Sequence, residues 1–269
     1  MKLIVLIDNN TYIDKYYLGE PAVSYYIEDM GRKILFDTGY SDAFIKNALS
    51  LGIDVSDIDI IALSHGHNDH TGGLRELINI DFNNKPELIA HPDALLFKKA
   101  DGMGIGCPVS QAELEKVMKI KTSVKPVRLT KRLIFLGEIP IKNDFEGRYS
   151  IGDTLKSGVE QKDFMLDDTA LAYIGENGLY IITGCSHSGI CNIILYAKEV
   201  TGIDKIGGVI GGLHLFDIDE RAVRTIDYLI KENIPIMYPC HCTSFKVRSK
   251  LSNAVNIIEV GVGLEINWE

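Results

Sequence analysis

Short runs of apolar residues alternate along the chain with stretches in which apolar residues recur every three or four positions. The short runs predict strands, and in the first third they lie at Leu3–Ile7, Ser24–Ile27, Lys33–Phe36, Ile58–Leu63 and Glu87–Ala90. A helical pattern runs from Ser41 to Leu51 and closes at Gly52, and another begins at Leu74. This alternation of strands and helices predicts an α/β fold.

The same alternation resumes in the later half, after a middle segment of mixed character. That segment contains a helix after Ser110, where Ser110 and Glu113 match a capping box, followed by basic, proline-containing sequence. Later strands are predicted at Leu171–Ile174, Leu179–Thr183, Lys205–Ile210 and Ile234–Tyr238, and a helix at Glu220–Glu232. Because no low-complexity linker separates the halves, we expect one domain over residues 1–269, with a lid or insertion around 92–170.

Three short motifs of the first half recur in the second half, in the same order and at nearly constant spacing. Thr38-Gly39 resembles Thr183-Gly184, IIALSHGH ending at His67 resembles GGVIGGLH ending at His214, and ELIAHP around His91 resembles IMYPCH ending at His241. This repetition predicts two similar βα halves packed together. The alternative is chance, since buried strands resemble one another.

Composition and charge narrow the partners of the protein. The formal net charge of −9 leaves no basic surface of the kind that binds nucleic acid or anionic lipid, so a small-molecule substrate is expected. The apolar run Leu3–Ile7 is too short for a signal peptide or a membrane span, which predicts a cytoplasmic location. The five cysteines are odd in number and sparse, which favours reduced thiols. The oligomeric state is left open.

The stretch SHGHNDHTGG at residues 64–73 concentrates three of the seven histidines and one aspartate. A predicted apolar strand leads directly into it, so these side chains lie on a loop at a strand's carboxyl end, where open α/β sheets bind ligands. Imidazole and carboxylate suit zinc, iron or manganese. A histidine-rich surface loop is the alternative, but the H-x-H-x-D-H spacing behind a buried strand favours a metal site.

This H-x-H-x-D-H, at His65, His67, Asp69 and His70, resembles the signature of the metallo-β-lactamase superfamily. Phe36-Asp37-Thr38-Gly39 matches a second recurring element of that superfamily. Asp8-Asn9, Gly137-Glu138-Ile139-Pro140, TGCSHSG at 183–189 and Gly211-Gly212-Leu213-His214 are similar to its dihydropteroate-synthase-like branch, which includes a dihydropterin aminobenzene ribofuranosyl phosphate synthase. The resemblance implies a four-layer αββα sandwich of two similar halves and a metal-dependent activity.

The resemblance also implies a ligand set for one or two divalent metal ions. His65 and His67 would bind a first ion, and Asp69 and His70 a second, which His241 would complete. Zinc is the first expectation, with manganese and iron as alternatives.

The remaining ligands fall where this chain departs from the common pattern. It has no Gly-His-Thr segment for the usual third histidine, and TGCSHSG stands where many relatives have Thr-Gly-Asp. His187 is then the best remaining ligand of the first ion. Cys185 occupies the place of the bridging carboxylate. Its thiolate either binds metal there or takes no part in metal binding. The sequence therefore leaves open whether both metal sites are fully occupied.

Other polar residues carry weaker expectations. His214 either binds the substrate or transfers a proton, or it is a structural histidine held by hydrogen bonds. His91 is expected to be structural. Asp37 is expected to orient a ligand from behind. Asp168, before a strand, either approaches the site or, as is commoner, lies in an exposed turn.

Two sets of residues near these motifs remain to be assigned. Cys240 and Cys242 flank His241 and are expected to be core thiols, because successive strand residues point to opposite faces. Cations of the 92–170 segment either serve an anionic substrate from a lid or are solvated surface residues; they are Lys98, Lys99, Lys125, Arg128, Lys131 and Arg132.

Three functional hypotheses follow. The leading one is metal-assisted hydrolysis or a related transfer at an ester, phosphoester or lactone-like bond, in which metal lowers the pKa of water to roughly 7 and Asp69 orients that water or carries the proton. The second is iron-dependent redox chemistry on the same ligands. The third is a metallated protein that binds a pterin or nucleotide without turnover.

Overall fold

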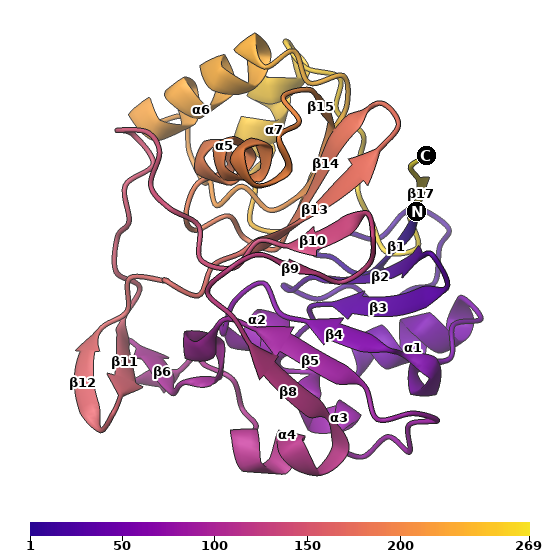
Figure 1. Cartoon of the computed structure of the whole chain (residues 1–269). Coiled ribbons are helices and arrows are strands. Elements are labelled where there is room, and N and C mark those ends of the chain that lie inside the picture. Colours follow the sequence, from indigo (N-terminus) through magenta and orange to yellow (C-terminus); the bar gives the residue numbers. More distant parts are fainter.

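Two large β-sheets stack face to face with helices on both outer sides, which gives four layers (Figure 1). The structure is a computed structural model and describes residues 1–269. The first sheet has the strand order β17 (Glu265–Asn267), β1 (Lys2–Ile7), β2 (Ser24–Asp29), β3 (Arg32–Phe36), β4 (Ile60–Ala62), β5 (Glu87–Ala90) and β8 (Lys119–Thr122). The second has the order β16 (Met237–Pro239), β15 (Ile206–Gly211), β14 (Gly178–Thr183), β13 (Ala170–Gly175), β10 (Leu133–Phe135) and β9 (Val127–Arg128).

The helices divide between the two outer layers. Those of the first half are α1 (Ala43–Ser50), α2 (Asn68–Thr71), α3 (Leu74–Leu77) and α4 (Gln111–Val117), and single 3₁₀ turns lie at Val55–Asp57 and Pro92–Leu95. The second sheet is covered by α5 (Ile190–Thr201), α6 (Glu220–Lys231) and α7 (Phe245–Ser252) (Figure 1). No helix in the structure has the length and apolar content needed to cross a bilayer.

The central strands of the two large sheets are buried on both faces, which explains why they appear in the sequence as continuous apolar runs. In β14, Tyr180 and Ile182 pack between the two sheets, whereas Leu179 and Ile181 pack under the outer helices. The αββα sandwich therefore has three apolar layers, one between the sheets and one beneath each set of helices.

The two halves repeat one strand pattern, which confirms the predicted correspondence. Strands β2 and β3 are antiparallel and β3, β4 and β5 are parallel, just as β13 and β14 are antiparallel and β14, β15 and β16 are parallel. Each repeated motif follows equivalent strands: His67 and His214 come after β4 and β15, and His91 and His241 after β5 and β16.

Two helices of the second half were not predicted from the sequence. Helix α5 begins with the largely apolar residues Ile190–Leu195 after Gly189, which provides no side-chain cap. Its first turn is satisfied from far away instead, because the buried carboxylate of Glu146 accepts hydrogen bonds from the main-chain nitrogens of Cys191 (3.1 Å) and Asn192 (2.9 Å). Helix α7 follows a Ser244 cap. By contrast, the capping box of Ser110 and Glu113 is present as predicted, and the helix expected from Leu74 is a single turn.

Only part of the 92–170 segment stands apart from the main sheets. Strand β8 joins the first sheet and β9 and β10 join the second. The part that stands apart is a small sheet of β12 (Val159–Lys162), β11 (Asp153–Lys156), β6 (Lys98–Ala100) and β7 (Met103–Gly104). It lies on the left in Figure 1, near α2. That it acts as a lid stays a prediction.

Candidate metal centre

The histidine-rich motif after β4 folds into a helical turn, and not into the open loop expected from the sequence. The main-chain nitrogens of His70 and Thr71 both donate to the carbonyl oxygen of His67 at 3.0 Å, which begins α2. His65 and His67 thus precede the turn, whereas Asp69 and His70 lie within it.

Asp37, at the end of β3, holds this motif from behind, as predicted. Its Oδ2 lies 2.7 Å from His70 Nδ1, and its two oxygens accept hydrogen bonds from the main-chain nitrogen (2.7 Å) and hydroxyl (2.6 Å) of Ser64. A Cβ on Gly184 would lie 2.2 Å from the Ser64 hydroxyl. The glycine of the TGC motif is therefore required for the two halves to approach this closely.

The predicted ligands form two adjoining clusters, and Cys185 belongs to both. Ligand atoms of Asp69, His70, Cys185 and His241 lie within 4.8 Å of one another, and so do those of His65, Cys185 and His187. A third group of the same spread contains His65, His67 and Asp69. The Cys185 Sγ lies 3.2 Å from His70 Nε2, so the thiol occupies the position between the two clusters.

Burial and mutual proximity keep most of these histidines uncharged. Burial, together with the neighbouring histidines, holds the pKa of His65 and of His187 well below its ordinary value. Burial lowers the pKa of His67 to about 4. Neutral imidazoles present the lone pair that a metal ion requires.

His241 departs from this pattern, because its pKa is raised above the ordinary value, and His70 departs from it further. Burial lowers the pKa of His70, but the carboxylates of Asp69 and Asp37 outweigh burial and raise it well above its ordinary value.

The donor set fits a bound metal. The Nε2 atoms of His65, His67 and His241 and both ring nitrogens of His187 are buried without a hydrogen-bond partner. Buried polar atoms are normally paired, and five unpaired imidazole nitrogens around one thiol and one carboxylate have the chemistry of zinc or iron ligands. The ligand roles of these residues stay a prediction.

The end of β1 positions His241, which follows β16. The His241 Nδ1 lies 3.0 Å from the side-chain oxygen of Asn9, and its main-chain nitrogen donates to Asp8 at 3.0 Å. These contacts leave the Nε2 free, at 3.4 Å from the Asp69 carboxylate. In the sequence, Asp8-Asn9 was only one of the motifs that resemble the dihydropteroate-synthase-like branch. The structure shows that both residues contact His241.

His214 lies beside the centre, at the end of β15. Its ring centroid is 4.3 Å from that of His187, and its Nδ1 lies 2.5 Å from the Tyr149 hydroxyl. Burial lowers the pKa of His214 to about 4 and raises that of Tyr149 to about 12, so both are neutral at pH 7. Tyr149 then donates to Nδ1, which places the imidazole proton on Nε2. No motif in the sequence pointed to Tyr149.

The two cysteines that flank His241 differ, which corrects one of the two predictions. Cys240 is a core thiol as expected, fully buried between the sheets at 3.2 Å from the Tyr25 hydroxyl. Cys242 instead lines the cleft, with its Sγ 3.6 Å from the carbonyl oxygen of Cys185. Burial raises the pKa of Cys242, but Cys185 and His241 outweigh it and lower that pKa to about 7.

Asp168 and His91 are both buried. For Asp168 this overturns the commoner case, an exposed turn: its Oδ2 accepts a hydrogen bond from the main-chain nitrogen of Ser188 at 2.8 Å, and burial raises its pKa to about 6. For His91 the structural expectation agrees with the contacts, since its Nδ1 accepts a hydrogen bond from the main-chain nitrogen of Asp93.

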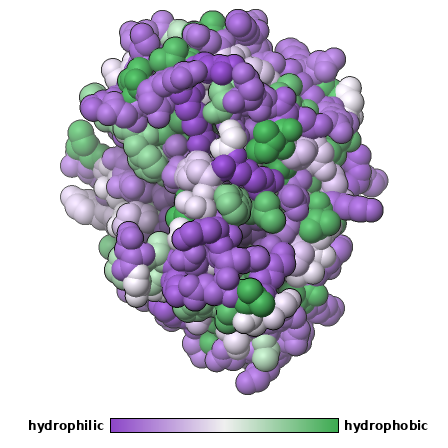
Figure 2. Space-filling view, turned by 90° about the vertical axis from the view of Figure 1, so that its left-hand side faces the viewer, coloured by the Kyte–Doolittle hydropathy of each residue, from purple (hydrophilic) through white to green (hydrophobic).

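A cleft of about 500 Å³ opens over the two clusters. Its walls include Asp69, Cys185, His187, His214 and His241, together with the exposed ring of Phe216. Figure 2 looks at the molecule from the side that carries the small sheet, where hydrophilic side chains dominate and hydrophobic ones form separate patches. None of the six cations suggested as lid residues lines the cleft.

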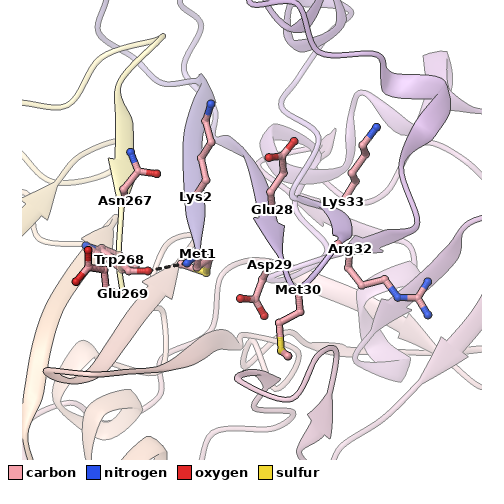
Figure 3. A pocket seen from close by; sticks show the side chains of 11 residues that line it. Met1, Lys2, Glu28, Asp29, Met30, Arg32, Lys33, Asn267, Trp268 and Glu269 are labelled. Atoms are coloured by element: carbon pink, nitrogen blue, oxygen red, sulfur yellow. Dashed lines mark hydrogen bonds between the residues drawn. The ribbon is translucent and has the colours of Figure 1, made fainter.

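A second hollow of about 600 Å³ lies at the opposite ends of the strands, among Met1, Lys2, the β2–β3 turn and residues 267–269 (Figure 3). The terminal amine of Met1 donates to the carbonyl oxygen of Trp268 at 2.6 Å. The side chains of Lys2, Glu28 and Arg32 splay apart in Figure 3 and do not converge on one point. Strand β1 separates this hollow from Asp8, so it has no part in the metal centre.

Comparison with known proteins places the chain in a family. The family model described as "Metallo-beta-lactamase superfamily" matches residues 18–116. The uncharacterized protein MJ0448 of Methanocaldococcus jannaschii is 35% identical over 261 residues, which cover 96% of this chain and 97% of that protein. The chain belongs to the metallo-β-lactamase superfamily.

A second relative and two solved structures refine this placement. A protein of the same organism, named 7,8-dihydropterin-6-methyl-4-(beta-D-ribofuranosyl)-aminobenzene-5'-phosphate synthase, is 33% identical over 264 residues, 93% of this chain and 90% of that protein. The crystal structure of Tm1679, described as a metal-dependent hydrolase of the β-lactamase superfamily, matches with a TM-score of 0.85 and 27% identity over 99% of this chain and 98% of that chain. Zinc-bound PqqB from Methylobacterium extorquens shares the fold, with a TM-score of 0.57 and 12% identity over 99% of this chain and 100% of that chain. The predicted fold and family resemblance are thereby confirmed.

Proposed function

We propose that the protein is a metal-dependent hydrolase, or a closely related transferase, acting on an ester, phosphoester or lactone-like bond of a small anionic substrate. The observation that carries this proposal is the pair of ligand clusters joined by Cys185 beneath an open cleft. The name of the 33% identical relative supports a pterin-related, phosphorylated substrate.

The proposed cofactor is one or two divalent ions, with zinc the first choice because thiolate and imidazole both suit it. His65, His67 and His187 would hold one ion, and Asp69, His70 and His241 the other, with Cys185 between them. When bound, such ions lower the pKa of water toward neutrality and stabilise negative charge that develops on the substrate.

Asp69 is the proposed proton carrier. Its Oδ2 lies between the Nε2 atoms of His70 (3.3 Å) and His241 (3.4 Å), and its side chain is 26% exposed. The carboxylate is therefore fixed on one side and open to the cleft on the other, where it orients water and accepts its proton. His214, with a proton on Nε2, is placed to donate a hydrogen bond to the substrate or to pass a proton to it.

The first test is the metal content of purified protein reloaded under reducing conditions. We expect about two zinc or manganese ions per wild-type chain and about one fewer in His65→Ala and in His241→Ala. His91→Ala is the matched control, because this buried histidine lies outside both clusters, and it should keep the wild-type content. Protein that binds no metal would overturn the proposal. If the bound metal is iron, the proposed activity becomes redox chemistry in place of hydrolysis.

The second test addresses Asp69 directly. On a phosphodiester or lactone that the wild type hydrolyses, Asp69→Ala should lose turnover while its circular dichroism remains that of a folded protein. Asp81→Ala, which removes an exposed carboxylate, should keep full turnover. Retention of activity in Asp69→Ala would rule out the proposed role.

A further inference from the structure

Arg221 has two guanidinium nitrogens that are buried without a hydrogen-bond partner. It lies in the first turn of α6 and is half-buried. Its Nε and Nη2 atoms are closed off from solvent and make no hydrogen bond. A buried cation is costly unless an anion or several acceptors offset it, so these two nitrogens mark a place where an acceptor is missing.

Three carboxylates at the starts of α5 and α6 contact groups other than Arg221. Asp219 caps α6 by accepting a hydrogen bond from the Ala222 main-chain nitrogen, and Glu220 faces Arg224. The buried carboxylate of Glu146 accepts hydrogen bonds from the start of α5. None of these three carboxylates accepts a hydrogen bond from the Nε or Nη2 atom of Arg221.

Contacts connect Arg221 to the wall of the cleft. Its guanidinium carbon lies over the ring of Tyr149, 5.4 Å from the ring centroid. Tyr149 in turn contacts His214, whose ring lies beside His187. The charge of Arg221, after burial, contributes to the lowered pKa of His214. Arg221 thus lies behind Tyr149, which contacts His214 in the wall of the cleft.

We propose that Arg221, behind Tyr149 and His214, forms an oxyanion subsite for the phosphate or carboxylate end of the substrate. Nε and Nη2 form one edge of the guanidinium, and that edge matches two oxygens of one anionic group. The inference rests on the proposed function, because it assigns part of the substrate to the same cleft. Entry requires Tyr149 to turn aside, and Tyr149 belongs to residues 136–152, which contain no helix or strand.

The experiment is calorimetric titration of metal-loaded protein with inorganic phosphate and, in a separate arm, with acetate. Arg221→Gln should weaken binding of one of these anions by roughly 10- to 100-fold, as expected for loss of a charged hydrogen bond, and Arg221→Lys should lie between. Lys231→Gln removes the same charge at the exposed far end of α6 and should bind like the wild type. Metal content, measured in each variant, should not change.

Equal binding by wild type and Arg221→Gln in both arms would overturn the subsite, since anions would then be held by the metal alone. Hydrolysis of phosphodiesters is measured on the same samples. Arg221-dependent binding without hydrolysis leaves the subsite standing and contradicts the proposed function. Hydrolysis together with anion binding that does not depend on Arg221 would support the proposed function and contradict the subsite.

Discussion

At the scale of single residues, the metal centre depends on a carboxylate that never reaches the cleft. Asp37 is fully buried and accepts hydrogen bonds from Ser64 while it contacts His70 Nδ1. This contact fixes the orientation of the His70 ring and directs its Nε2 toward Cys185 and Asp69. Partners of this kind behind metal-binding histidines control both ring orientation and ligand basicity.

Asp37→Asn should therefore weaken metal binding without any change at a ligand. The amide group places a donor where three donors already converge, so at least one hydrogen bond is lost. We expect metal affinity to fall roughly 10- to 100-fold, measured by competition with a chelator. Asp59→Asn, at the other end of β3, serves as the control, and equal affinities of the two variants would contradict the role given to Asp37.

At the scale of elements, one buried lysine connects the small sheet to the histidine motif. Lys98 of β6 is 1% exposed, and its Nζ donates to Asp163 (2.6 Å) and Asp167 (2.9 Å). Asp167 also accepts a hydrogen bond from the main-chain nitrogen of Gly66, between His65 and His67. Lys98 was expected either to offer its charge to an anionic substrate or to be a solvated surface residue, and the structure instead buries it, where it links the small sheet to the turn at α2.

The charges of Lys98, Asp163 and Asp167 determine the pH range in which their contacts stabilise the fold. Burial alone would raise the pKa of Asp167, but the positive charge of Lys98 has the larger effect and lowers that pKa. Burial alone would lower the pKa of Lys98, but the charges of Asp167 and Asp163 have the larger effect and raise it. The stabilisation from Asp167 is present above its unfolded pKa of ~3.9 and is lost as pH falls through the folded value. That from Lys98 is present below ~10.4 and is lost as pH rises through the folded value.

Lys98→Met should lower the free energy of unfolding by roughly 3–5 kcal/mol at pH 7, because two buried carboxylates lose their cation. The deficit should shrink as pH falls below the unfolded pKa of Asp167, ~3.9, because the wild type then loses the stabilisation that Asp167 contributes. Urea denaturation at both pH values measures this. Lys99→Met, the exposed neighbour paired with Glu160, should have little effect, and the same small effect in Lys98→Met would be the contrary result.

At the scale of the whole molecule, the candidate ligands come from both halves of the chain. Residues 65–70 follow β4 of the first sheet, whereas Cys185, His187 and His241 follow strands of the second. A metal bound by both sets links the sheets at one edge of the sandwich. Removal of metal should then destabilise the entire fold and not only the turn at α2.

Chelation should accordingly lower the Tm of the wild type. A ligand at 100 times its Kd contributes about 2.7 kcal/mol, a loss that scanning calorimetry detects readily in a chain of this length. The His65→Ala and His241→Ala double variant is the control, since its Tm should respond little to chelator. A wild-type Tm that is indifferent to chelation would show that metal does not link the halves.

The sequence also predicted the relation of the two halves. Thr183-Gly184, Gly211-Gly212-Leu213-His214 and His241 were expected to match Thr38-Gly39, His67 and His91, and all three pairs follow equivalent strands. The repetition was visible because a buried strand followed by a tight turn leaves a local pattern in the sequence. Helix α5 left none, because its cap, Glu146, lies more than forty positions upstream in sequence and meets the helix only in the folded chain.

The sequence by itself determined the α/β alternation, the two-half repetition and the H-x-H-x-D-H motif, since each depends on spacing within one strand, helix or turn. Only the tertiary structure decided that Cys185 lies within ligand distance of both clusters, that Cys242 lines the cleft while Asp168 is buried, and that two guanidinium nitrogens of Arg221 are buried without a hydrogen-bond partner. These properties depend on which strand ends lie next to one another and on which polar and charged groups lie around each ionisable side chain. Both are sums over contacts between residues far apart in sequence, which no local pattern records.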